Sequence, residues 1–91
     1  MRFEWDARKA KANLRKHGVS FEEARTVFED RDARMEFDSA HSDEEDRFLL
    51  LGFSGSDRPL IVSYCYKDGD LIRIISARKA APRDQLAYRK R

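Results

Sequence analysis

Two arginines interrupt an apolar, β-branched segment near the end of this 91-residue chain, LIRIISARKA. A guanidinium group is planar and permanently charged, and it binds phosphate or carboxylate oxygens through parallel N–H groups. The segment therefore predicts a strand that presents Arg73 and Arg78 to an anion. Because side chains alternate between the two faces of a strand, Arg73 and Arg78 are expected on opposite faces. Arg78 lies at the strand end, where its side chain can reach either face. The alternative is that Arg73 pairs with an acidic residue of a neighbouring strand, such as Glu36 or Asp38.

The hairpin signal at Asp68 and Gly69 predicts which residues face this strand. With these two residues as the loop, Tyr64 lies opposite Arg73. One register of the preceding hairpin places Arg47 beside Tyr66. We therefore expect a cluster on one sheet face, because arginines beside tyrosines suit phosphate binding and base stacking. Its members are Arg47, Tyr64, Tyr66 and Arg73.

Two further residues, Glu45 and His17, suit proton transfer beside an anion. Glu45 and Arg47 alternate on one face of a predicted strand, which would place a carboxylate base beside a cation. Such a pair could cleave a phosphodiester through a neighbouring 2′-hydroxyl without a metal, although a plain surface salt bridge is the alternative. His17 follows Lys16 at a predicted helix end, where it could transfer a proton or contact phosphate. The alternative is a histidine favoured there by the helix macrodipole.

The composition argues against several other kinds of site. Two histidines and one cysteine argue against a structural zinc site, and we expect Cys65 to pack as a small apolar side chain. There is no glycine-rich phosphate loop and no serine-nucleophile motif, so we expect no cofactor. The lone cysteine and the lack of a signal-peptide-like apolar segment predict a cytoplasmic protein.

Charge is segregated along the chain, although the formal net charge is only +2. Residues 7–17 contain five basic side chains and no acidic one, whereas residues 20–46 contain eleven acidic side chains and three arginines. From Arg73 to the end there are seven basic residues, Arg83 among them, and one acidic residue, Asp84. The two basic segments would form a polyanion-binding surface if they meet in the fold. Neutralisation by the acidic middle segment is the alternative.

Capping residues define two helices near the N-terminus. Asp6 is a suitable N-cap and Gly18 a suitable C-cap for a helix over residues 7–16. Ser20 and Glu23 form a capping box for a second helix that continues to residue 30.

Alternating apolar residues predict the strands of a single α+β domain over residues 1–91. Met35 and Phe37 alternate as in a half-buried strand, and Pro82 suits the first turn of a final helix. The expected order is β-α-α-β-β-β-β-α around a twisted antiparallel sheet, with strands over residues 2–5, 33–38, 46–54, 58–67 and 71–78.

Three of these segments together resemble a known family. They are FEWDARKAKANLRKHGVSFEEARTVFED, DRFLLLGFS and IRIISARKA, and Tyr88 follows them. They are similar to the BrnT toxins of BrnT/BrnA type II toxin–antitoxin modules over nearly the whole chain, Phe3 to Tyr88. The most specific parts are NLRKHGVSFEEA and RIISAR, since neither fits a generic pattern.

The resemblance implies a RelE-like fold and a ribonuclease that cuts RNA without a metal and so stops translation. It also implies a partner antitoxin, BrnA, with a ribbon-helix-helix domain. The complex, a dimer or a toxin–antitoxin heterotetramer, would bind operator DNA through the antitoxin and repress its own operon. The family's recurrent polar residues fall here on Lys16, His17, Glu45 or Asp46, Arg47, Arg73, Arg78 and Tyr88.

One departure from the family lies at the start of the last helix. The family often has ARxATxxE there, whereas this chain has ARKAAPRD. Ala81 cannot cap as Thr would, a loss of about 1 kcal/mol that Pro82 partly offsets. Asp84 stands where the longer Glu is usual, so we expect a shorter reach toward an arginine.

Together these interpretations predict a site that cleaves RNA. Arg73 and Arg78 would bind RNA phosphate, Arg47 would stabilise the pentavalent phosphate, and His17 or Glu45 would accept the proton. The alternative is a module that binds nucleic acid or the antitoxin without cleaving. Further RNA contacts are expected from Lys16, Tyr64, Tyr66, Arg83 and Tyr88, of which Tyr88 would position a base or donate a proton.

Overall fold

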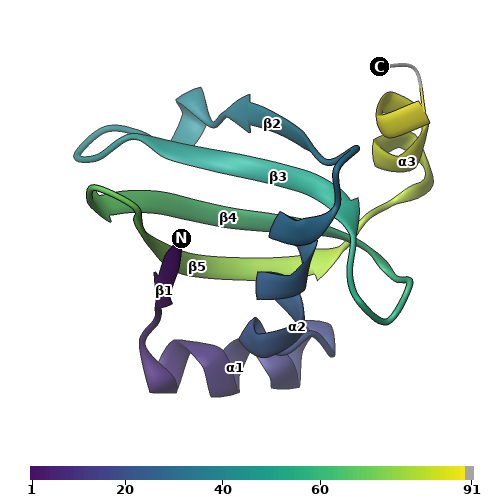
Figure 1. Cartoon of the computed structure of the whole chain (residues 1–91). Helices are drawn as coiled ribbons and strands as arrows, with labels where there is room; N and C mark the ends of the chain where they lie inside the picture. Colours follow the sequence, from purple (N-terminus) through teal and green to yellow (C-terminus); the bar gives the residue numbers. More distant parts are fainter. Residues whose placement is uncertain (90–91) are drawn as a thin grey trace.

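The computed structural model describes residues 1–89, and in this range one five-stranded sheet carries three α-helices and two 3₁₀-helices, labelled η (Figure 1). Their bounds are β1 (Arg2–Glu4), α1 (Ala7–His17), α2 (Phe21–Thr26), η1 (Val27–Glu29), β2 (Arg34–Phe37), η2 (Ser39–His41), β3 (Arg47–Phe53), β4 (Pro59–Asp68), β5 (Leu71–Lys79) and α3 (Pro82–Arg89). The strand order is β1-β5-β4-β3-β2, in which β1 is parallel to β5 and the other neighbours are antiparallel. The predicted α+β class and element order are confirmed. Lys90 and Arg91, the end of the predicted basic segment, lie outside the described residues.

The first two helices begin where their capping residues predict. The Asp6 carboxylate accepts two N–H groups of the first turn of α1, and Gly18 ends that helix with a left-handed φ of 69°. Ser20 Oγ accepts the N–H of Glu23 at 3.0 Å. The second helix is shorter than predicted, because the chain tightens into η1 at Val27, which is buried. No helix of residues 1–89 is long and apolar enough to cross a membrane.

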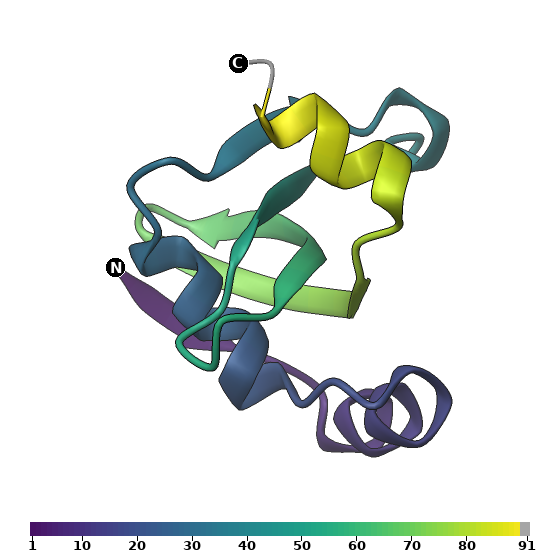
Figure 2. The same cartoon turned by 90° about the vertical axis from the view of Figure 1, so that its right-hand side faces the viewer.

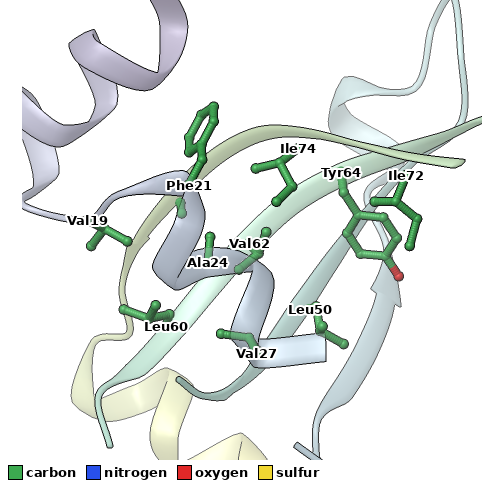
Figure 3. Packing of buried hydrophobic residues seen from close by; sticks show 11 residues of the cluster. Val19, Phe21, Ala24, Val27, Leu50, Leu60, Val62, Tyr64, Ile72 and Ile74 are labelled. Carbon is green, nitrogen blue, oxygen red and sulfur yellow. The ribbon is translucent and has the colours of Figure 1, made fainter. Parts of the chain in front are cut away.

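The core lies between the sheet and the layer formed by α2 and η1, as Figure 3 shows for its main side chains. Ile74 and Ala77 of β5 both belong to this core although they are three residues apart. A β-bulge explains this, since Tyr64 pairs with Ile74 but Ser63 pairs with Ser76. The fully assembled core contains Val19, Phe21, Ala24, Val27, Leu50, Leu60, Val62, Tyr64, Ile72, Ile74 and Ala77.

The predicted hairpin between β4 and β5 is wrong by one residue. Asp68 pairs with Leu71, so the loop is Gly69–Asp70 and not Asp68–Gly69. A second bulge, between Tyr66 and Asp68, precedes the turn, and as a result Tyr64 pairs with Ile74 and does not lie opposite Arg73. A one-residue change of register moves a side chain to the other sheet face.

The prediction that β2 is half-buried through Met35 and Phe37 is also wrong. Their exposed fractions are 56% and 53%. β2 is the edge strand, whereas η1 packs against β3, so the helical layer leaves these side chains uncovered. Phe37 retains an edge-on contact with Phe48, at 5.8 Å between ring centroids.

The buried side chain of Asn13 joins α1 to β5. β1 pairs with the first three residues of β5, and the Asn13 amide occupies the same edge further along. Its Nδ2 donates to the carbonyl of Ala77 at 2.8 Å and to that of Val19 at 2.9 Å, and its Oδ1 accepts the N–H of Ala77 at 3.0 Å. Asn13 therefore replaces one residue of a neighbouring strand and fixes the end of α1 beside the end of β5.

The carboxylate of Asp30 joins α3 to the sheet. Its Oδ2 accepts the N–H of Phe53 at 2.8 Å and the hydroxyl of Tyr88 at 3.0 Å. The ring of Tyr88 also packs edge-on against Phe53, at 5.5 Å between centroids. Gly52 makes room for this arrangement, because a Cβ there would lie 2.9 Å from Asp30 Oδ2 and from Ala33 Cβ.

A part-buried ion pair between Glu23 and Arg58 joins α2 to the loop between β3 and β4. Arg58 Nε donates to Glu23 Oε2 at 2.9 Å, and Ser54 Oγ donates to the same oxygen at 2.7 Å. Arg58 Nη2 also donates to the carbonyl of Gly18 at 2.9 Å. The hydrogen bond from Arg58 holds the pKa of Glu23 below its ordinary value.

Asn13→Ala should destabilise the protein by about 2–4 kcal/mol, because three buried backbone groups lose their hydrogen bonds. Urea denaturation of both proteins measures this loss. Lys11→Ala, at an exposed position of the same helix, should change stability by less than about 0.5 kcal/mol. Equal stability of the Asn13 variant and the wild type would contradict the role given to this amide.

Glu23→Gln should make the stability of the protein depend less on pH in the acidic range. Because the folded-state pKa of Glu23 is lowered, its contribution is complete above its unfolded pKa and disappears as the pH falls through the folded value. The urea midpoint of the wild type should therefore fall more steeply than that of the variant between about pH 5 and pH 3. Glu22→Gln, at the exposed neighbouring position, should keep the wild-type slope.

Candidate functional site

A groove of about 310 Å³ lies on the sheet face opposite α2. It is bounded by the last residue of α1 and by η2, and its floor is formed by β3, β4 and β5. Figure 2 shows α1 and α3 at opposite ends of the molecule, with the sheet between them. The polar lining residues are His17, Asp38, His41, Arg47, Ser63, Ser76 and Arg78. Three predicted site residues, His17, Arg47 and Arg78, thus meet in one groove.

Arg47 is the first residue of β3 and is held from both sides of its backbone. Its N–H donates to Ser42 Oγ at 2.9 Å, and its carbonyl accepts the N–H of Asp38 at 2.8 Å. The guanidinium Nε is buried and has no hydrogen-bond partner among the described residues, although Glu45 Oε2 lies 3.5 Å away. Glu45 thus forms an ion pair with Arg47, although this nitrogen lacks a well-formed hydrogen bond.

Arg78 reaches the groove face because of the bulge in β5. Its Nη1 lies 3.3 Å from Asp84 Oδ2, and the same oxygen accepts the N–H of Ala81 at 2.8 Å. Asp84 therefore reaches the arginine despite being shorter than Glu, and it also caps the start of α3. Arg83 lines an adjoining hollow together with Arg78 and Asp84.

His17 and Lys16 form the end of α1, where Asn13 anchors the helix to β5. His17 lines the groove, whereas Lys16 is exposed on the surface beside it. Lys16 belongs to the basic stretch of α1, so a polyanion in the groove would continue onto this helix.

His41 is a functional candidate that the sequence interpretation missed. Its Nδ1 lies 2.9 Å from Asp38 Oδ2. Asp38 is itself fixed, because its carbonyl accepts the Ser42 hydroxyl at 2.6 Å. In the sequence, the only indication of this pair is that Asp38 stands three positions before His41. The two residues lie in an irregular segment, where such a spacing does not predict a contact.

Glu45 lies outside the groove, in a neighbouring acidic hollow of about 270 Å³. Lys67 Nζ donates to its Oε1 at 3.2 Å, and this hydrogen bond lowers the pKa of Glu45. A carboxylate whose pKa is lowered is a weaker base, so the geometry favours a histidine as proton acceptor. The residues of this acidic hollow are Ala40, His41, Asp43, Glu44, Glu45 and Arg47.

Arg73 shares the sheet face with Arg47 but does not line the groove. Cys65 lies between them in register, and burial raises the pKa of its thiol, as expected for a packed apolar side chain. Arg73 Nε donates to Glu4 Oε2 at 2.7 Å, which raises the pKa of the guanidinium further. The alternative of an acidic partner is thus correct, with Glu4 of β1 in place of Glu36 or Asp38.

The three tyrosines do not join the arginines, which corrects the predicted cluster. Tyr64 is 2% exposed and lies in the core, and burial raises the pKa of its phenol. Tyr66 is exposed but contacts the rings of Tyr64 and Phe48, on the helix-covered face. The hydroxyl of Tyr88 is bound to Asp30, so this residue holds α3 in place. Arg47 pairs with Cys65 and not with Tyr66, and the shifted turn and the bulge beside it separate Tyr64 from Arg73.

The groove brings together side chains whose chemistry suits anion binding and proton transfer. Arg47 and Arg78 carry positive charge, and His17 and His41 supply imidazole rings, the side chain most often used for general acid–base catalysis. Among residues 1–89 no group of three or more His, Cys, Asp or Glu side chains is arranged to hold a metal ion.

Comparisons with known proteins show the family and the fold of this chain. Residues 5–84 match the family model described as the ribonuclease toxin BrnT of type II toxin–antitoxin systems. The 1.1 Å crystal structure of the Brucella abortus ribonuclease toxin BrnT superposes with a TM-score of 0.68 and 22% sequence identity, over 89% of this chain and 97% of that one, which shows a common fold. A search of curated proteins finds no match. The chain belongs to the BrnT family of ribonuclease toxins.

Proposed function

We propose that this chain is an endoribonuclease that cuts RNA in the groove without a metal ion. The observation that carries the proposal is the meeting of Arg47, Arg78 and His17, from three separate elements, on one uncovered sheet face. Arg78 binds an RNA phosphate, and Arg47, which also lines the groove, binds the phosphate that reacts.

The reaction is an internal transfer of the phosphoryl group. The ring of His17 accepts the proton of a ribose 2′-hydroxyl, and the 2′-oxygen attacks the adjacent phosphorus. The P–O bond to the 5′-oxygen of the next nucleotide breaks, which leaves a 2′,3′-cyclic phosphate and a 5′-hydroxyl. Arg47 stabilises the additional negative charge of the pentavalent phosphate, because the backbone from which it extends is fixed before the reaction.

The basic side chains of α1 extend the binding surface for RNA beyond the groove. They are exposed and lead away from His17 along one helix, so they bind backbone phosphates without reading sequence. Arg83 provides a further cation beside Arg78. The basic members of α1 are Arg8, Lys9, Lys11, Arg15 and Lys16.

Membership of a type II family gives the toxin an antitoxin partner, and the finer description follows from the resemblance. The antitoxin is a BrnA-like protein with a ribbon-helix-helix domain, which assembles with the toxin as a heterotetramer and carries the complex to operator DNA. Cleavage of RNA in the cytoplasm stops translation until the antitoxin binds.

Purified protein incubated with a short RNA and EDTA tests this proposal. Wild-type protein should cleave, and Arg47→Gln should lower the rate constant about 10²- to 10³-fold, because one charge-stabilising donor is lost. Arg73→Gln is the matched control, since Arg73 lies on the same face but is bound to Glu4 outside the groove. It should retain a rate within about tenfold of the wild type, which is well above that of the Arg47 variant.

Two outcomes would contradict the assignment. Tight RNA binding with intact RNA in EDTA would favour the alternative of a binding module. Equal losses of cleavage rate in both arginine variants, with unchanged thermal unfolding, would show that Arg73 takes part in the reaction. The groove would then not be the whole site.

A further inference from the structure

We propose that His41, oriented by Asp38, is the second proton-transfer residue of the groove and donates a proton to the leaving 5′-oxygen. This inference rests on the proposed ribonuclease function. The reaction described above leaves a 5′-oxygen that carries negative charge, and it accounts for one histidine only. A group that protonates this oxygen as the P–O bond breaks would complete the transfer.

The ring of His41 is held in one orientation. Asp38 Oδ2 lies 2.9 Å from Nδ1, and a carboxylate accepts hydrogen bonds, so Nδ1 carries its hydrogen. Nε2 is then the nitrogen available to a substrate. The side chain of His41 is 68% exposed, whereas that of Asp38 is 13% exposed. The histidine is therefore accessible to RNA while its partner is held within the fold.

Asp38 is fixed by the same backbone that fixes Arg47. Its N–H donates to the Arg47 carbonyl at 2.8 Å, and its own carbonyl accepts the N–H of His41 at 3.2 Å and the hydroxyl of Ser42 at 2.6 Å. Ser42 Oγ in turn accepts the Arg47 N–H. These bonds hold the histidine and the arginine in one rigid unit, which is the geometry that transfer to a phosphate held by Arg47 requires.

The charges around His41 come from four parts of the fold. Arg47 of β3 borders both the groove and the acidic hollow, as His41 does. His17 and Arg78 face it across the groove from α1 and β5. The loop after η2 contributes Asp43, Glu44 and Glu45 to the acidic hollow.

The two histidines then divide the proton transfers. His17 takes the proton of the 2′-hydroxyl as the 2′-oxygen bonds to phosphorus. The imidazolium of His41 gives its Nε2 proton to the 5′-oxygen as the P–O bond breaks. The products are the cyclic phosphate and the 5′-hydroxyl, with His17 charged and His41 neutral, so atoms and charge balance without a further reactant.

The decisive experiment uses RNA in which sulfur replaces the leaving 5′-oxygen at one linkage. A thiolate leaves without being protonated, so it removes the need for a donor. On ordinary RNA in EDTA, His41→Ala should cleave about 10²- to 10⁴-fold more slowly than the wild type. On the sulfur-containing RNA the same variant should cleave within about tenfold of the wild type, whereas His17→Ala should remain defective on both substrates.

Asp38→Asn tests the positioning role of the carboxylate. It should slow cleavage of ordinary RNA, recover on the sulfur-containing RNA, and add little to the defect of His41→Ala. A purely structural role would not produce recovery on the sulfur substrate. Ser39→Ala, at an exposed position of the same 3₁₀-helix, should match the wild type on both substrates.

The outcomes separate this inference from the function on which it rests. Wild-type cleavage of ordinary RNA with an unimpaired His41→Ala variant would overturn the donor role and leave the ribonuclease proposal intact. A His41→Ala defect that persists on the sulfur substrate would also overturn it. A wild type that fails to cut RNA at all would overturn both proposals.

Discussion

The arrangement of the groove depends on the amide of Asn13, which bonds to the backbone of β5. A helix that lies along a strand edge cannot normally satisfy that edge, because its own backbone groups bond within the helix. The carboxamide presents one donor group and one acceptor with the spacing of a peptide, and both bond to Ala77. α1 is thereby held as though it were part of the sheet, and His17 is placed at the groove.

The opposite wall also rests on the backbone of an edge residue. Ser42 Oγ accepts the N–H of Arg47, and the backbone N–H of Asp38 donates to the carbonyl of the same residue. The segment between β2 and β3 thus folds back onto the first residue of β3. It carries His41 to the groove although this segment contains no regular strand. Both walls rest on β-sheet backbone, so the groove has a rigid floor and rigid sides.

The acidic residues of the middle segment act locally and do not cancel the basic segments uniformly. Glu23 neutralises Arg58 at the loop between β3 and β4, and Glu4 binds Arg73 at the parallel edge. Glu45 is turned to Lys67. Arg47 and Arg78 line the groove, although each lies near one carboxylate, that of Glu45 and that of Asp84. Glu4 lies outside the acidic middle segment, and Arg58 and Lys67 lie outside the two basic segments, so the polyanion-binding surface stays a prediction.

The sequence by itself determined the element order, the helix caps, the strand limits and the identity of the residues that could bind phosphate, because these depend on local periodicity and side-chain type. Only the tertiary structure decided which of those residues meet. The bulge in β5 places Arg78 on the same sheet face as Arg73. The register between β4 and β5 places Tyr64 on the opposite face from Arg73, in the core. A bulge reverses side-chain parity at the cost of one unpaired residue, and nothing in a short-range pattern marks its position. His41 and Asp38 likewise pair through a turn whose shape is set by β3, so contacts distant in sequence had to form before that site existed.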